Sequence, residues 1–102
     1  MDGAGFEVVV EPEARRARLI GELDLSSCDR ASEAIAPLLL APGDVELDLS
    51  GLRFTDSSGL RVFVQVKSEL GDRGSLVLRS PNPHVRKILE IAGIADLGIE
   101  VK

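Results

Sequence analysis

The chain has 102 residues, of which 44% are hydrophobic and 28% are charged, and its formal net charge is −5. This length and mixture are typical of one folded domain, which we expect to span residues 1–102. A negative charge and only three aromatic residues, all phenylalanine, argue against nucleic acid as a partner, because phosphates need basic surface and bases need stacking platforms.

The sequence contains no recognisable membrane or secretion signal. No apolar run approaches the roughly 20 residues that span a bilayer. The start, MDGAGFEVVVEPE, lacks the basic and apolar regions of a signal peptide. We therefore expect a cytoplasmic protein that does not engage membranes.

The chain has one cysteine, Cys28, and one histidine, His84. This pair is too small for a typical zinc site, and a single cysteine cannot form an internal disulfide. We expect Cys28 to be a small buried packing residue, although a reactive thiol stays open. The sequence gives no reason to expect a metal or a cofactor.

The first forty residues predict a β-hairpin followed by a helix. Apolar and polar residues alternate through FEVVVEPEARRARLIGELD, which indicates two antiparallel strands joined by a turn at residues 12–15. Helical spacing follows over residues 25–40, behind the possible N-caps Ser26 and Ser27. Because proline removes a backbone hydrogen bond, Pro37 predicts a kink or a second short segment.

The remaining residues predict three more strands and two more helices. DVELDLS (44–50) is a strand whose polar side, with Glu46 and Asp48, we expect to be solvated, and a loop over residues 50–56 follows it. A helix from Leu60 ends near Gly71 and Gly74. The other elements are a strand at SLVLRS (75–80), a helix that starts at Asn82 and Pro83 and stops at Gly93, and an edge strand at GIEVK (98–102).

The order is ββαβαβαβ. Right-handed crossovers between successive parallel strands place the intervening helices on the same side of a sheet. We therefore predict an α/β fold with a mixed β-sheet and helices on one face. The turn that leaves the third strand then lies at the carboxyl edge, where α/β proteins place their sites.

At that edge the stretch RFTDSSGLRVF (53–63) sets Asp56, Ser57 and Ser58 where a turn becomes a helix. Asp56 and Ser57 are favoured N-cap residues, and capping alone is one explanation. It leaves Thr55, Ser58 and Gly59 unexplained. Gly59 fits either tight packing or close backbone access by another molecule.

A hydrolytic serine is a second explanation, and it lacks partners. The pattern G-x-S-x-G is absent, and His84 is the sole candidate base. The G-K-[ST] ending of a phosphate-binding loop is absent as well. We therefore expect no enzymatic activity.

A third explanation is that a serine hydroxyl accepts a phosphoryl group from another protein. The start of a helix offers free amides and a partial positive charge to an anion, while Asp56 and Asp24 oppose it. Such a balance suits a reversible modification.

The sequence resembles the STAS domains, and among them the bacterial anti-sigma factor antagonists. The resemblance covers almost the whole chain and is carried by four segments: GELD (21–24), LDLSGLRFTDSSGL (47–60), GSLVL (74–78) and VRKILEIAGI (85–94). The D-S-S-G-L segment is the most specific. Relatives often continue into a further C-terminal helix, whereas the last residues of this sequence are GIEVK (98–102).

The resemblance implies a phosphorylation site and a set of partners. Ser57 is the expected acceptor, with Ser58 the lesser candidate, and the partner-binding residues are Asp24, Thr55, Asp56, Ser57, Ser58 and Gly59. The implied phosphoryl donor is the ATP bound by an anti-sigma factor serine kinase. The implied enzyme that removes the phosphate is a PP2C-type phosphatase. The unmodified antagonist would bind the kinase and release a sigma factor.

The family implies an alternative role as well. STAS domains also serve as non-phosphorylated subunits of lipid-transport ABC systems and as modules of sensory assemblies or transporters. In those settings the acceptor position has no phosphorylation to undergo. The sequence names neither the sigma factor nor the kinase, and it gives no basis for an oligomeric state.

Overall fold

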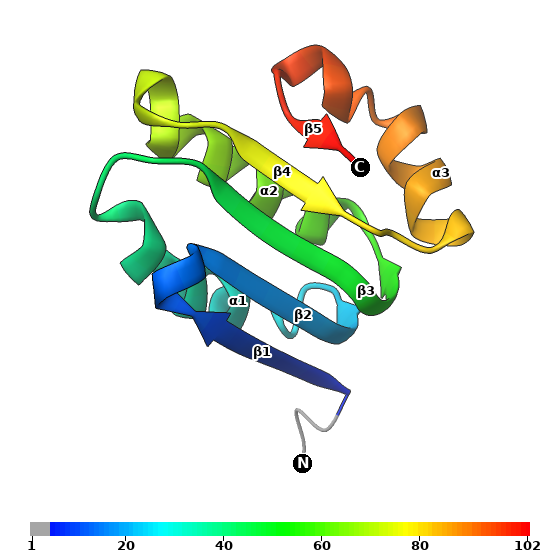
Figure 1. Cartoon of the computed structure of the whole chain (residues 1–102). Helices are drawn as coiled ribbons and strands as arrows, with labels where there is room; N and C mark the ends of the chain where they lie inside the picture. Colours follow the sequence, from blue (N-terminus) through cyan, green and yellow to red (C-terminus); the bar gives the residue numbers. More distant parts are fainter. Residues whose placement is uncertain (1–4) are drawn as a thin grey trace.

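The computed structural model describes residues 5–102. Residues 1–4 begin the stretch in which the sequence shows no signal-peptide character, and they lie outside the described range. The helices and strands, in chain order, are β1 Phe6–Glu11, β2 Arg16–Leu23, α1 Cys28–Ile35, β3 Val45–Thr55, α2 Ser57–Leu70, β4 Leu76–Arg79, α3 Pro83–Ile91 and β5 Glu100–Val101. The predicted order ββαβαβαβ is confirmed (Figure 1).

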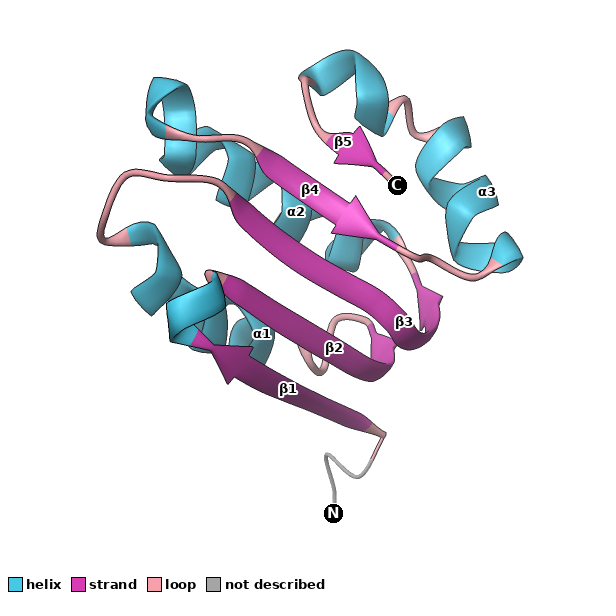
Figure 2. Ribbon diagram, in the orientation of Figure 1, coloured by secondary structure: helices cyan, strands magenta, loops and turns pink. Residues whose placement is uncertain are grey.

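Within residues 5–102, five strands form one mixed sheet in the order β1-β2-β3-β4-β5. β1 and β2 pair antiparallel, and every later pair is parallel. The hairpin turn closes with Arg15 in the left-handed region at φ 51°. Each parallel pair needs a crossover, and α1, α2 and α3 supply these three connections (Figure 2).

The core lies on one side of this sheet. α1 and α2 lie behind the sheet in Figure 1, and α3 lies near its β5 edge. All three helices and the inward-facing strand residues form a single apolar cluster. Its members include Leu19, Leu47 and Leu78 from the strands, Phe63 from α2 and Leu89 from α3. The expectation of helices on one face therefore agrees with the burial.

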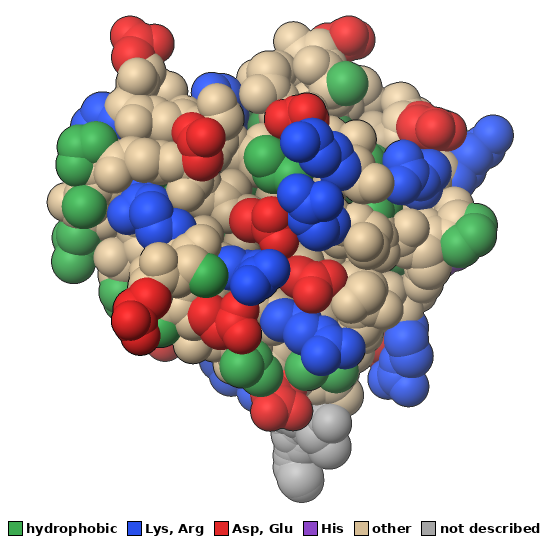
Figure 3. Space-filling view, viewed as in Figure 1, with side chains coloured by type: hydrophobic (Ala, Val, Ile, Leu, Met, Phe, Trp, Pro, Cys, Tyr) green, Lys and Arg blue, Asp and Glu red, His purple; other side chains and the backbone are tan. Residues whose placement is uncertain are grey.

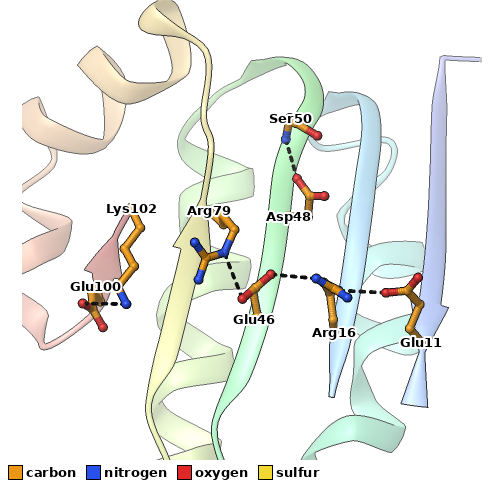
Figure 4. Close-up of polar contacts among 8 residues, drawn as sticks. All are labelled: Glu11, Arg16, Glu46, Asp48, Ser50, Arg79, Glu100 and Lys102. Atoms are coloured by element: carbon orange, nitrogen blue, oxygen red, sulfur yellow. Dashed lines mark hydrogen bonds and ion pairs between the residues drawn. The ribbon is translucent and has the colours of Figure 1, made fainter. Parts of the chain in front are cut away.

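The opposite face of the sheet is open to solvent and carries intermixed positive and negative side chains (Figure 3). Glu46 lies at its centre, 3.3 Å from Arg16 and 3.0 Å from Arg79, and Arg16 also reaches Glu11 at 2.8 Å (Figure 4). The polar side of β3 is thus solvent-facing as expected, and it is organised by ion pairs across four strands.

The segment after β2 follows the prediction from Pro37. α1 ends at Ile35, and a 3-10 turn, Ala36–Leu39, contains the proline. The predicted capping is wrong in detail. Ser27 occupies the N-cap position, but its hydroxyl makes no cap bond; it donates instead to the carbonyl oxygen of Glu22 at 2.9 Å.

The loop expected over residues 50–56 is strand down to Thr55. Backbone pairing continues through Ile20 with Gly51 and Leu23 with Thr55, with irregularities along the way. These irregularities break the alternation from which a strand is recognised in sequence. Gly51 fits there because a Cβ would lie 3.0 Å from the side chain of Ile20.

Within the described residues, no helix combines the length and the apolar character that crossing a membrane requires.

Candidate functional site

The site lies where β2 and β3 end side by side. Leu23 and Thr55 are paired at the carboxyl ends of these two parallel strands, so Asp24 and Asp56 are the first residues beyond the sheet on each. The amide of Asp56 donates to the carbonyl oxygen of Leu23 at 3.3 Å, and this bond connects the segments that leave β2 and β3. The turn that leaves β3 thus lies at the carboxyl edge of the sheet, as the sequence predicted, and Asp24 lies beside it.

Asp56 caps α2. Its Oδ1 accepts hydrogen bonds from the amides of Ser58 at 2.9 Å and Gly59 at 3.4 Å. Its carbonyl oxygen accepts the first helical bond, from Leu60, at 3.1 Å. The cap predicted from sequence is present, and the Asp56 carboxylate occupies two of the first-turn amides that an anion would otherwise use.

Ser57 is the first residue of α2 and its side chain is exposed. In the described part of the chain its hydroxyl makes no hydrogen bond, so neither a cap nor a core contact holds it. Ser58 is half-buried, and it lines a groove between α1 and α2. Of the two serines, Ser57 is therefore the more exposed to a visiting molecule.

Thr55 and Gly59 are the buried residues of the turn that carries Ser57. Thr55 is fully buried, and its hydroxyl donates to the carbonyl oxygens of Leu23 at 3.2 Å and Asp56 at 3.3 Å. A Cβ on Gly59 would lie 2.0 Å from Thr55 Oγ1 and 2.9 Å from Leu23 Cγ. Both residues therefore pack inside the turn that presents Ser57, and their direct role in partner binding stays a prediction.

Asp24 organises the neighbouring turn. Its Oδ1 accepts from the hydroxyl of Ser26 at 2.7 Å and from the amide of Ser26 at 3.0 Å. These bonds, led by the one from the hydroxyl, hold the pKa of Asp24 below its ordinary value and keep the carboxylate ionised. Asp24 is half-buried, and it adds a fixed negative charge at the edge that carries Ser57.

The groove between α1 and α2 has a volume of about 150 Å³ and reaches the start of α2. Its lining includes Cys28, Ser58 and Arg61. Cys28 is half-buried, so the expectation of a fully buried packing residue is only partly correct. The sequence analysis assigned Arg61 no site role, although its four-residue spacing from Ser57 is visible in the sequence.

His84, the candidate base, is stacked on Phe54 with ring centroids 6.1 Å apart. In the described range it makes no hydrogen bond with Ser57, and nothing activates the serine as a nucleophile. Residues 5–102 contain no group of three or more His, Cys, Asp or Glu side chains that could hold a metal ion.

The comparisons with known proteins agree on one family. The family model described as "Mlab, STAS domain" matches residues 6–99. The anti-sigma-B factor antagonist of Listeria monocytogenes is 34% identical over 84 residues, which cover 80% of this chain and 73% of that protein. The chain therefore belongs to the STAS domain family, and its relatives there include anti-sigma factor antagonists.

Solved structures give the same result for the fold. The anti-sigma factor antagonist SpoIIAA in its unphosphorylated form superposes with a TM-score of 0.74 at 25% identity, covering 95% of this chain and 87% of that one. The Bacillus cell fate determinant SpoIIAA in its phosphorylated form superposes with a TM-score of 0.63 at 21% identity, covering 95% and 90%. The second comparison supports the fold alone.

Proposed function

We propose that this chain, as a single STAS domain over residues 1–102, is an anti-sigma factor antagonist that is switched off by phosphorylation of Ser57. Unmodified, it binds an anti-sigma factor serine kinase in the cytoplasm and thereby releases a sigma factor. The observation that carries this proposal is the exposed hydroxyl of Ser57, which makes no hydrogen bond within residues 5–102, at the first position of α2 in the D-S-S-G-L segment.

The chemistry is phosphoryl transfer catalysed by the partner. The Ser57 oxygen forms a bond to the γ-phosphorus of ATP held by the kinase, the bond from that phosphorus to the β,γ-bridging oxygen breaks, and ADP leaves. The hydroxyl proton passes to a base of the kinase. A PP2C-type phosphatase hydrolyses the phosphoserine, so this chain supplies an acceptor and no enzymatic machinery.

The edge that carries Asp24, Asp56, Ser57 and Ser58 is the docking surface. A phosphate adds about −1.5 to −2 charges at neutral pH. Against one partner carboxylate about 4 Å away, at an effective dielectric constant of ~20, each added charge costs about 4 kcal/mol before salt screening. Since about 1.4 kcal/mol weakens binding tenfold, local repulsion is large enough to end the complex.

The test is to incubate the chain with the anti-sigma factor kinase of its own organism and ATP, and to map the modified residue by mass spectrometry. We expect one phosphate on Ser57 in the wild-type chain and in Ser58→Ala, and none in Ser57→Ala. Labelling on Ser58 alone would overturn the assignment. An absence of label, together with stable binding to a transporter ATPase, would favour the transport-subunit alternative.

A further inference from the structure

Arg61 lies one helical turn beyond Ser57. α2 is a continuous helix from Ser57 to Leu70, and residues four apart on a helix lie on the same face with their Cβ atoms about 5–6 Å apart. Both side chains are exposed. Among the described residues Arg61 forms no ion pair, so its guanidinium is available to a new anion on the same face.

A phosphate on Ser57 would need a side-chain cation because the backbone offers it little. The amides of Ser58 and Gly59 already donate to Asp56 Oδ1. The nearby carboxylates, Asp56 and Asp24, repel a phosphate. The usual stabilisation of an anion by the start of a helix is thus largely used by the cap.

Arg53, the other arginine near Ser57 in the sequence, faces a different part of the molecule. Arg53 lies 3.9 Å from Glu22 and lines a hollow on the open face of the sheet with Glu7 and Gly51. Asp29 lines the groove that contains Arg61, but at a distance that forms no ion pair within the described range. Arg61 is therefore the cation on the same helical face as Ser57, one turn away. It lies C-terminal to Ser57, and an i,i+4 ion pair is most favourable when the anion precedes the cation in this way.

We propose that Arg61 is the intramolecular counter-ion of phosphoserine 57, an inference that rests on the proposed function. Its planar guanidinium donates to two phosphate oxygens at once. This pair favours the doubly charged phosphate, whose second ionisation otherwise falls near pH 6. Arg61 thereby keeps the repulsive charge at its full value at neutral pH and fixes the phosphate on the docking edge.

The test inserts phosphoserine at position 57 by genetic code expansion, so that no kinase is needed, and follows the phosphorus NMR signal against pH. Removing a nearby positive charge disfavours the dianion, so Arg61→Gln should move the titration midpoint up by roughly half a pH unit. The matched control is Arg18→Gln, an equal charge change on an exposed residue of β2, which should leave the midpoint in place. Equal midpoints for wild type and Arg61→Gln would overturn the pairing.

A second measurement keeps the inference testable if the phosphoserine chain does not fold. Ser57→Asp places a smaller negative charge at the same position, and Arg61→Gln should then lower its melting temperature by about 2 °C more than it lowers that of the Ser57 chain. Identical losses in both backgrounds would contradict the pairing. Neither measurement involves the kinase. A failure of kinase labelling would contradict the proposed function, whereas these two measurements test the pairing of Arg61 with a charge at position 57.

Discussion

Gly59 occupies a position where a side chain would collide with the residues that support the turn before Ser57. Its missing Cβ faces Thr55 Oγ1 and Leu23 Cγ, and the Thr55 hydroxyl joins the ends of β2 and β3. Sequence alone left close access by a partner and tight packing equally open. A side chain at position 59 would point at Thr55 and Leu23, which favours the explanation by tight packing. Leu23 belongs to β2, and the sequence around Gly59 does not show that this strand lies next to it.

Gly59→Ala should therefore destabilise the fold. The added methyl group must displace Thr55 or Leu23, and overpacking of this kind typically costs about 1–3 kcal/mol. Urea unfolding monitored by circular dichroism measures the loss. Gly5→Ala is the matched control, because a Cβ there has no neighbour within 4 Å; equal stability of the two variants would argue against tight packing at Gly59.

Among the elements, those with strong local signals were predicted well. Pro37 breaks the first helical segment, and Asn82 caps α3 through a bond from the amide of Val85 at 2.7 Å. The extension of β3 to Thr55 was missed. Its last residues pair irregularly with β2, so what makes them a strand is a neighbour about thirty positions away and not their own alternation.

The connection into β3 depends on a long-range contact of the same kind. Arg15, in the hairpin turn, donates from Nη2 to the carbonyl oxygens of Leu38 at 2.9 Å, Ala41 at 2.8 Å and Gly43 at 3.2 Å. Its Nε donates to the carbonyl oxygen of Asp44 at 3.1 Å. One side chain thus anchors the whole link between the 3-10 turn and β3.

Arg15→Met keeps most of the aliphatic stem and removes all of these donors. We expect the free energy of unfolding to fall by about 1–2 kcal/mol. This is near the lower end of the range for hydrogen bonds that involve a charged group, because part of this network is exposed. Faster amide hydrogen exchange over residues 38–44 would locate the effect. Arg18→Met, an exposed arginine on β2, serves as the control; if it matches Arg15→Met in both stability and exchange, the anchor does not exist.

For the whole molecule, the division between a covered and an open face of the sheet would keep the proposed switch local. The docking edge is built from the ends of β2 and β3 and the first turn of α2, whereas the apolar cluster lies between the sheet and the helices. Because Ser57 is exposed, adding a phosphate there displaces no core residue. The proposed switch therefore needs added charge at the edge and no change in the sheet.

The most direct test is calorimetric titration of the cognate anti-sigma factor with the unmodified chain and with the chain carrying phosphoserine at position 57, alongside nitrogen–proton NMR spectra of both. We expect affinity to fall at least tenfold, with spectral changes confined to residues near the start of α2. Equal affinity, or changes that spread through the sheet, would contradict a local electrostatic switch at Ser57.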